Sequence, residues 1–402
     1  MFKDISDALM GECSIGFDQG LRADDIEWYS TGSKSLDMQL NGGRLDRGGI
    51  PSGKLTIFSG LKSCGKTYFA MKAAIDFMSK VERGYVFFFD SEYNVTVDTF
   101  VNAGMPEEFG PRLVIIRVNT MEEFRTKIVR IFQTIESKKK SDVRAFVILD
   151  SVGGLIPQKA YDEANAAPNA KGVAEVKASM GRPQQVIKEF TKIAVHEGGK
   201  LNVPIIFVSH VYKDNNAPNP KYAGNIVSGG EGLYYFNSNL VEFSRRKSKD
   251  DKVENKTQHD VNGILVTSKL VKSRFAREET KVLSLIHFNL GVIPTYGFVS
   301  MAEQAGLVQK KGLRFFSEKW GEKCYSLRQI NSDQTLMEPL MTELQKWTIA
   351  QFGLGKMSLS TADALDFTEN STKINFENVM DEEDPDHEET DETEDFEIDS
   401  PE

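Results

Sequence analysis

The amino-acid sequence predicts an α/β fold with a mostly parallel central sheet. The first observation is a glycine-rich loop at 60–67, which lies between an apolar, strand-like run and a helix-like stretch without Gly or Pro. The second is a series of continuously apolar runs separated by helix-like stretches, a pattern typical of parallel strands that are covered on both faces. The runs lie at 54–59, 85–90, 113–118, 145–150 and 204–209, and the helix-like stretches at 68–80, 121–138 and 184–196.

The glycine-rich loop has the complete spacing GxxxxGK[ST] of a phosphate-binding loop. In such loops, backbone N–H groups and the N-terminus of the following helix hold the anion. The lysine reaches the β- and γ-phosphates, and the hydroxyl of the last residue ligates Mg²⁺. The sequence therefore predicts a nucleoside triphosphate and Mg²⁺ as cofactors. The expected nucleotide contacts are Gly60, Leu61, Lys62, Ser63, Cys64, Gly65, Lys66, Thr67 and Tyr68.

Cys64 inside this loop has two interpretations. It is either a small residue that fills space, or a thiol made reactive because a helix N-terminus lowers its pKa. The second interpretation predicts that alkylation of Cys64 blocks nucleotide binding and that bound nucleotide protects the thiol.

Carboxylates follow two of the apolar runs. Asp150 ends the run at 145–150, the form of a second Mg²⁺ ligand that acts directly or through water. Asp90 and Glu92 follow the run at 85–90, where a carboxylate can orient the water that attacks the γ-phosphate. Alternation along a strand puts Asp90 and Glu92 on the same side, so spacing alone does not choose between them.

Two stretches of 20 residues or more follow the ends of predicted strands, at 157–182 and 211–230. Structureless loops of this length are uncommon in compact domains and are usually functional or disordered. Their basic and aromatic residues suit single-stranded nucleic acid, through phosphate pairing and base stacking, although ordinary surface loops are the alternative. The candidate nucleic-acid contacts are Lys159, Lys171, Arg182, Tyr212, Lys213, Lys221 and Tyr222.

The later part of the chain predicts additions to the core. Segments 240–246, 262–273 and 281–288 alternate apolar and polar residues and are expected as antiparallel strands at one edge of the sheet. Lys272 and Arg274 end the second of these, either as a solvated edge or as cations that reach the γ-phosphate of a neighbouring subunit.

Four regions are expected along the chain. Residues 1–31 form an N-terminal segment, 32–290 the ATPase core, 291–354 a small α+β subdomain, and 355–402 a polar linker with an acidic tail. Residues 381–402 hold fourteen Asp or Glu and no Lys or Arg, so this tail is expected to be disordered and to act as an interaction segment. Without it the chain holds 49 basic and 45 acidic residues, a net charge of about +4.

Composition excludes several classes of protein. No run of 18 apolar residues exists, so no membrane span is predicted. The first residues mix charges and lack the apolar core of a signal peptide. Cys13, Cys64 and Cys324 lie far apart without a CxxC motif, which argues against a disulfide framework or a zinc site. We expect a protein of a reducing, cytoplasmic compartment, the host cytoplasm if a phage encodes it.

Together these motifs resemble the RecA-type recombinases, and most closely the UvsX-type recombinases of tailed phages. The resemblance runs from about 32 to 353, and the selective motifs are Asp90-Ser91-Glu92 and Lys272-Ser273-Arg274. It implies ATP as the nucleotide, Glu92 as the residue that positions water, and His210 as the γ-phosphate sensor. It also implies Lys66, Lys272 and Arg274 as catalytic cations, the last two acting in trans.

The resemblance further implies a RecA-like core in which the His210 strand lies between the loop strand and the Asp150 strand. The two long stretches become DNA-binding loops. Where the family often stacks a tyrosine on adenine, this chain has Thr99, so the neighbouring Phe100 is the candidate contact.

The implied function is an ATP-dependent DNA recombinase that forms homo-oligomeric filaments on single-stranded DNA and pairs that strand with homologous duplex DNA. It would act in recombination, repair and recombination-dependent replication, with single-strand-binding and mediator proteins as partners. One alternative is a hexameric helicase motor, although about 30 residues before the core leave little room for a collar domain. Another is a mediator without catalytic activity, against which the presence of Glu92 argues.

Overall fold

A computed structural model describes residues 26–138, 142–165, 182–213, 225–249 and 261–354 of the 402-residue chain. The candidate DNA contacts Lys171, Lys221 and Tyr222 and the acidic tail lie outside the described residues. Among the helices that are described, none is both long and apolar enough to cross a membrane.

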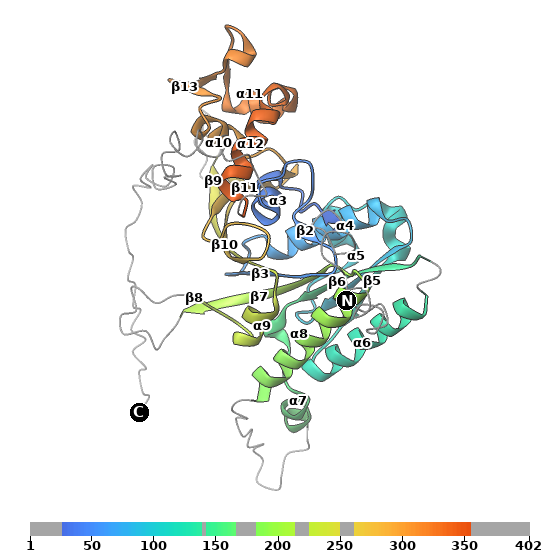
Figure 1. The fold of residues 1–402 in the computed structure, drawn as a ribbon. Helices are drawn as coiled ribbons and strands as arrows, with labels where there is room; N and C mark the ends of the chain where they lie inside the picture. The colour runs from blue at the N-terminus through green and yellow to red at the C-terminus, as the bar shows by residue number, and fades with distance from the viewer. Residues whose placement is uncertain (1–25, 139–141, 166–181, 214–224, 250–260, 355–402) are drawn as a thin grey trace, which may run out of the picture.

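A ten-stranded sheet forms the centre of the molecule (Figure 1). Its main order is β12-β11-β10-β9-β3-β7-β6-β4-β5, and β8 pairs with β7 outside this path. The strands are β3 (Leu55–Gly60), β4 (Gly84–Asp90), β5 (Leu113–Arg117), β6 (Arg144–Asp150), β7 (Ile205–Lys213), β8 (Asn225–Val227), β9 (Asn239–Lys249), β10 (Val261–Ser273), β11 (Lys281–His287) and β12 (Gly291–Ile293). Strands β3 to β7 pair in parallel, and β7 lies between β3 and β6, as the resemblance implied.

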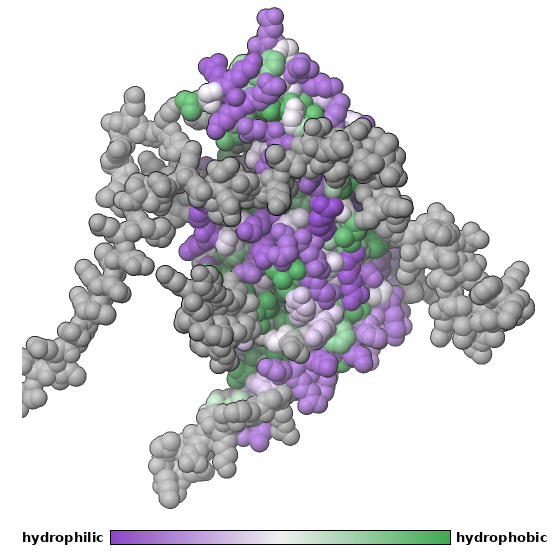
Figure 2. Space-filling view, turned by 60° about the vertical axis from the view of Figure 1, so that its left-hand side comes forward, coloured by the Kyte–Doolittle hydropathy of each residue, from purple (hydrophilic) through white to green (hydrophobic). Residues whose placement is uncertain are grey.

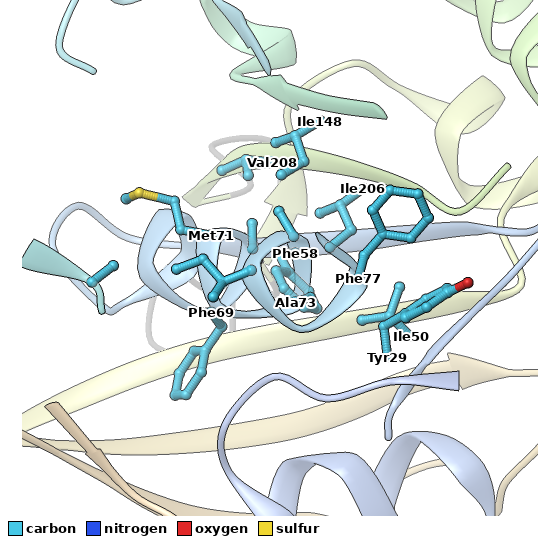
Figure 3. Packing of buried hydrophobic residues seen from close by; sticks show 14 of the residues in the cluster. Tyr29, Ile50, Phe58, Phe69, Met71, Ala73, Phe77, Ile148, Ile206 and Val208 are labelled. Carbon is cyan, nitrogen blue, oxygen red and sulfur yellow. The ribbon is translucent and has the colours of Figure 1, made fainter. Parts of the chain in front are cut away.

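Helices cover both faces of the parallel part of the sheet (Figure 1). One face packs on α4 (Lys66–Lys80) and α5 (Val97–Asn102), and the other on α6 (Met121–Ser137) and α8 (Arg182–Lys200). Successive strand residues divide between the two faces, since Ile148 joins the first cluster and Leu149 the second. This double burial explains why these strands have no polar face. In the first cluster, Phe77 of α4 lies beside Tyr29 and Ile206 (Figure 3).

The added strands differ from the prediction in one respect. Strand β9 runs parallel to β3, whereas β10, β11 and β12 follow in antiparallel order. The prediction that 240–246 is antiparallel is therefore wrong for its contact with the core and right for its contact with β10. The parallel sheet therefore extends by one strand, β9, before the antiparallel edge begins.

The C-terminal region is a small α+β unit above the sheet (Figure 1). It has its own apolar cluster, which includes Phe298, Leu344 and Trp347, and in the view of Figure 2 hydrophilic residues cover most of its surface. Its elements are α10 (Phe298–Gln304), β13 (Gln309–Lys311), β14 (Arg314–Phe316), η6 (Glu318–Trp320), β15 (Cys324–Ser326), α11 (Leu327–Ser332), η7 (Gln334–Leu336), η8 (Glu338–Leu340) and α12 (Met341–Phe352).

Several short elements were not predicted. The stretch expected as a loop from 157 begins with a helix, and the stretch from 211 is partly a β7–β8 pair. Trp28 and Tyr29, in the expected N-terminal segment, are buried against the core. The elements that the sequence analysis did not list are β1 (Trp28–Tyr29), α3 (Lys34–Asn41), β2 (Ile50–Pro51), η2 (Glu107–Arg112), η4 (Val152–Gly154), α7 (Gln158–Asn165) and α9 (Glu231–Phe236).

Asp37 in α3 is a buried carboxylate near the first strand. Its oxygens accept hydrogen bonds from the Ser30 hydroxyl at 2.5 Å and from the Thr31 amide and hydroxyl at 2.8 and 2.7 Å. Burial raises the pKa of Asp37 to about 6, although these hydrogen bonds oppose the rise.

We expect Asp37→Asn to change how stability depends on pH. A raised folded pKa stabilises the fold fully below the unfolded value, near 4, and this contribution is lost as pH rises through about 6. Between pH 4.5 and 7.5, the unfolding free energy of the wild type should therefore fall relative to Asp37→Asn, by roughly 3 kcal/mol at most. Urea unfolding at several pH values measures this difference. A difference that does not vary with pH would contradict the assignment.

Candidate nucleotide-binding site

The phosphate-binding loop joins the end of β3 to the start of α4. Gly60 has φ +145°, and a Cβ at this position would lie 2.3 Å from the Phe243 carbonyl oxygen of β9, so only glycine fits. Gly65 has φ +87° and is the N-cap of α4, with no side chain between the helix N-terminus and a ligand. This backbone suits the predicted role of the loop, in which N–H groups and the helix N-terminus would hold an anion.

Lys66 and Thr67 begin α4 and lie where the motif requires them. The buried Lys66 Nζ donates to the Gly60 and Leu61 carbonyl oxygens at 2.8 and 2.6 Å, so the ammonium lies along the loop. The Thr67 hydroxyl donates to Asp150 Oδ2 at 2.5 Å. The structure thus brings together the two predicted Mg²⁺ ligands, from α4 and from the end of β6.

The Thr67–Asp150 pair suits Mg²⁺. Burial raises the pKa of Asp150 to about 6, opposed by the hydrogen bond from Thr67 and reinforced by the charge of Glu92. A buried carboxylate of this kind gains from a cation that replaces its missing solvation. No cluster of three or more His, Cys, Asp or Glu is found among the described residues. Mg²⁺ usually takes one or two protein carboxylates and completes its shell with phosphate and water, and Asp150 could supply one of these carboxylates.

Glu92 lies two residues beyond the end of β4 and contacts Ser151, which follows β6, and His210 of β7. Its Oε1 accepts hydrogen bonds from Ser151 Oγ and from His210 Nε2, both at 2.8 Å. Burial alone would raise the pKa of Glu92, but these two hydrogen bonds outweigh it and hold the pKa below its usual value. Glu92 is therefore a carboxylate at neutral pH and an acceptor.

Asp90, the alternative candidate for orienting water, is buried, and both of its carboxylate oxygens accept hydrogen bonds from backbone amides. Its Oδ1 accepts from the Glu92 amide at 3.1 Å and its Oδ2 from the Val95 amide at 3.0 Å. Asp90 therefore shapes the turn that carries Glu92, and the geometry favours Glu92 as the group available to a water molecule.

These residues line one pocket of about 970 Å³. Its lining includes residues of the phosphate loop together with Asp150, Glu92 and His210. It also includes two segments that the sequence did not predict, residues 102–104 at the end of α5 and the turn between β11 and β12. In that turn Phe288 and Leu290 are 62% and 72% exposed, which makes them available to a flat, apolar base.

The structure does not support Phe100 as the contact for adenine. Its side chain is fully buried and packs edge-on against Phe88, with ring centroids 5.5 Å apart. The short helix α5 turns Phe100 toward the sheet, and Thr99 lines the pocket instead. Nothing in the local sequence marks the turn at 288–291 as part of the pocket, because its exposure and its approach to α4 depend on tertiary packing.

Cys64 is also buried, which favours the space-filling interpretation. Its Sγ donates to the Leu61 carbonyl oxygen at 3.0 Å, and burial raises the pKa of the thiol, although Lys66 opposes the rise. The expectation of a lowered pKa is wrong, because the thiol lies beneath the loop among apolar side chains of the core.

We therefore expect alkylation of Cys64 to be slow. In nucleotide-free protein, Cys64 should react with iodoacetamide at least about 10-fold more slowly than a typical exposed thiol, because the thiolate is the nucleophile. The half-buried Cys324 serves as the internal reference. Peptide mass spectrometry over time gives both rates, and faster labelling of Cys64 than of Cys324 would restore the reactive-thiol interpretation.

The candidate DNA contacts are placed less completely. Tyr212 is 54% exposed on β7, and Lys159 is exposed on α7, where it pairs with Glu163 at 3.6 Å. Arg182 is the first residue of α8, and Lys213 is the last residue of β7. Strands β6 and β7, which precede the two long stretches, end at the same edge of the sheet as the phosphate loop.

Lys272 and Arg274 lie at the end of β10 and do not line the pocket of their own chain. Lys272 Nζ donates to the carbonyl oxygens of Tyr234 and Tyr235 at 2.5 and 3.2 Å and lies over the Tyr234 ring. Burial and then the charge of Arg274 lower the pKa of Lys272. Arg274 is exposed.

Comparisons with known proteins agree with this geometry. The RecA N-terminal domain family matches residues 5–292. The "Recombination and repair protein" of Enterobacteria phage T4 is 25% identical over 280 residues, which cover 68% of this chain and 65% of that protein, just under two thirds of its length. "Protein RecA" of Bdellovibrio bacteriovorus is 25% identical over 340 residues, covering 84% of this chain and 80% of that protein. "Protein RecA" of Thermus aquaticus is 26% identical over 292 residues, covering 72% and 75%.

The family match covers far more than half of the chain and includes every element that forms the pocket. The phosphate loop, the two carboxylates and the order of the central strands also agree with it. This chain therefore belongs to the RecA family.

Proposed function

We propose that this protein is an ATP-dependent DNA recombinase. It would assemble as a filament on single-stranded DNA, hold ATP between subunits, and pair the bound strand with homologous duplex DNA. The observation that carries the proposal is the convergence of Lys66, the Thr67–Asp150 pair and the Glu92–His210 pair on one pocket of a RecA-family fold.

Each residue has a defined task in ATP hydrolysis. Lys66 and the loop amides bind the phosphates, while Thr67 and Asp150 would hold Mg²⁺, which offsets charge on the β- and γ-phosphates. Glu92 accepts a hydrogen bond from the attacking water and orients it. His210, which contacts Glu92, would respond to the γ-phosphate and pass its presence along β7 toward the DNA-binding stretch.

DNA would lie along the edge of the sheet where β6 and β7 end. Lys159, Lys171, Arg182, Lys213 and Lys221 would pair with phosphates, and Tyr212 and Tyr222 would stack on bases. Contacts to phosphate position the strand, and base pairing between the two DNA molecules reads homology. Single-strand-binding and mediator proteins are the expected partners, in the cytoplasm.

The test is ATP hydrolysis with and without single-stranded DNA, followed by strand exchange between a single-stranded circle and a homologous linear duplex. We expect DNA-stimulated hydrolysis and joint molecules that require homology. Unwinding of a forked duplex without joint molecules would instead support the helicase alternative. DNA binding without hydrolysis would support the mediator alternative.

A further inference from the structure

The Glu92 carboxylate is held by one oxygen and open at the other. Oε1 accepts from both Ser151 Oγ and His210 Nε2, whereas the nearest described partner of Oε2 is the exposed Asn94 amide at 3.4 Å. Since water activation needs an oxygen with a free lone pair, Oε2 is the atom that can accept from the attacking water.

The two hydrogen bonds to Glu92 Oε1 come from donors that differ in their freedom to move. The His210 side chain is 31% exposed, and in the proposed function His210 also interacts with the γ-phosphate. Ser151 is fully buried at the end of β6, and its hydroxyl must donate, because an ionised carboxylate can only accept. The Glu92 side chain is 35% exposed and would otherwise be free to rotate, so the hydrogen bond from Ser151 is the one that restricts it in every state.

Ser151 is in turn fixed by Ser91. The Ser91 hydroxyl donates to the Ser151 carbonyl oxygen at 2.7 Å and accepts from the Ser151 amide at 2.8 Å. The Ser91 amide also donates to the Asp150 carbonyl oxygen at 2.9 Å. The turn that carries Glu92 is thus tied to the end of β6 by three bonds besides the one from the Ser151 hydroxyl.

Gly154 makes room for this link. A Cβ at Gly154 would lie 2.4 Å from Ser91 Oγ, far inside contact distance. Gly154 does not have a positive φ, so alanine suits its backbone and the contact with Ser91 is what excludes it.

We propose that Ser151 is a positioning residue for ATP hydrolysis, and that Ser91 and Gly154 hold it in place. Ser151 fixes the Glu92 carboxylate so that Oε2 faces the water, and it does so whether or not His210 has left Glu92 for the γ-phosphate. This inference rests on the proposed function, in which Glu92 orients the attacking water.

The test is steady-state ATP hydrolysis by the full chain with Mg²⁺ and single-stranded DNA. Ser151→Ala should lower kcat about 10-fold, with KM for ATP within about 2-fold of the wild type, because positioning affects the transition state more than binding. Ser91→Ala and Gly154→Ala should lower kcat in the same direction while leaving the Ser151 hydroxyl present. These two variants also test the link if Ser151→Ala does not fold.

Matched controls separate positioning from loss of structure. Ser268→Ala removes another buried hydroxyl, one that donates to Gln39 at 3.0 Å, and Gly110→Ala adds a methyl group with no atom within 4 Å. Both should keep wild-type kcat.

The decisive comparison adds Ser151→Ala to Glu92→Gln. If Ser151 acts through Glu92, the second change should have less than about a 2-fold effect on the residual rate. An equal loss in both backgrounds, or wild-type kcat in Ser151→Ala while Glu92→Gln is inactive, would overturn the inference and leave the proposed function standing. Wild-type turnover by Glu92→Gln itself would overturn the role of Glu92 and the inference with it.

Discussion

Glu92→Gln is expected to lose at least about 10²-fold in ATP turnover and to keep ATP and DNA binding. The amide oxygen of glutamine can still accept from Ser151, so the turn should keep its shape, but a neutral amide is a poor acceptor for a water proton. Phosphate contacts by Lys66 and the loop do not involve Glu92. Steady-state hydrolysis with single-stranded DNA, together with binding of a fluorescent ATP analogue, measures both parts.

Glu189→Gln is the control, since Glu189 is exposed on α8 and pairs with Arg125 at 3.3 Å, away from the pocket. It should hydrolyse ATP at the wild-type rate. If Glu92→Gln keeps turnover within a few-fold, Glu92 does not activate water and Asp90 becomes the candidate. Asp90 would then have to release the two backbone amides that occupy its oxygens.

Lys272→Ala or Arg274→Ala is expected to reduce DNA-stimulated hydrolysis by about 10³-fold, as removal of a trans-acting cation does in other ATP- and GTP-hydrolysing enzymes. Both residues lie at the end of β10, outside the pocket of their own chain. Lys272 must also leave the Tyr234 and Tyr235 carbonyl oxygens to reach a phosphate. Lys269→Ala is the control, because Lys269 lies on the same strand and pairs with Glu279 at 2.7 Å.

Mixing experiments separate action in trans from action within one subunit. Lys66→Ala should bind ATP poorly yet still present Lys272 and Arg274 to a neighbour. Combined with Lys272→Ala or Arg274→Ala, which keep intact phosphate loops, it should restore part of the lost hydrolysis. Failure to restore activity at every mixing ratio would contradict the assignment in trans.

The parallel core was predictable because burial on both faces leaves a local signal. Strands β3 to β7 appear in the sequence as continuous apolar runs, each within a few residues of its observed bounds apart from the extension of β7 to Lys213. Two of these runs end at Asp90 and Asp150, and His210 directly follows the predicted run at 204–209, so these candidate site residues could be found from the ends of the runs. The resemblance supplied the place of the His210 strand between its two neighbours, which local periodicity does not contain.

The part of the pocket that the turn at 288–291 forms was not predictable from local sequence. Phe100 is next to the expected stacking position, but the direction of a side chain on a six-residue helix depends on how that helix packs on the sheet. The turn at 288–291 meets Tyr68 of α4 across more than 200 residues of sequence: a Cβ at Gly291 would lie 2.7 Å from the Tyr68 hydroxyl. The parallel pairing of β9 with β3 was also not predictable from local sequence. Alternation of apolar and polar residues shows which face of a strand is buried, but not whether the neighbouring strand is parallel or antiparallel.

The link from Ser151 through Ser91 to Gly154 shows the same limit at finer scale. Each residue is small and ordinary in the sequence, and the asymmetry of the Glu92 carboxylate follows only when β4, β6 and β7 are assembled. The phosphate loop and the residues at the strand ends indicated the pocket, and tertiary packing determines how its atoms are held.

The central claim is that this chain forms a recombinase filament, and electron microscopy of the full chain with ATP, Mg²⁺ and long single-stranded DNA tests it most directly. We expect continuous helical filaments that coat the DNA, that require nucleotide, and that Lys66→Ala does not form. Closed rings threaded on the DNA, or separate particles with no polymer at any protein concentration, would contradict the account.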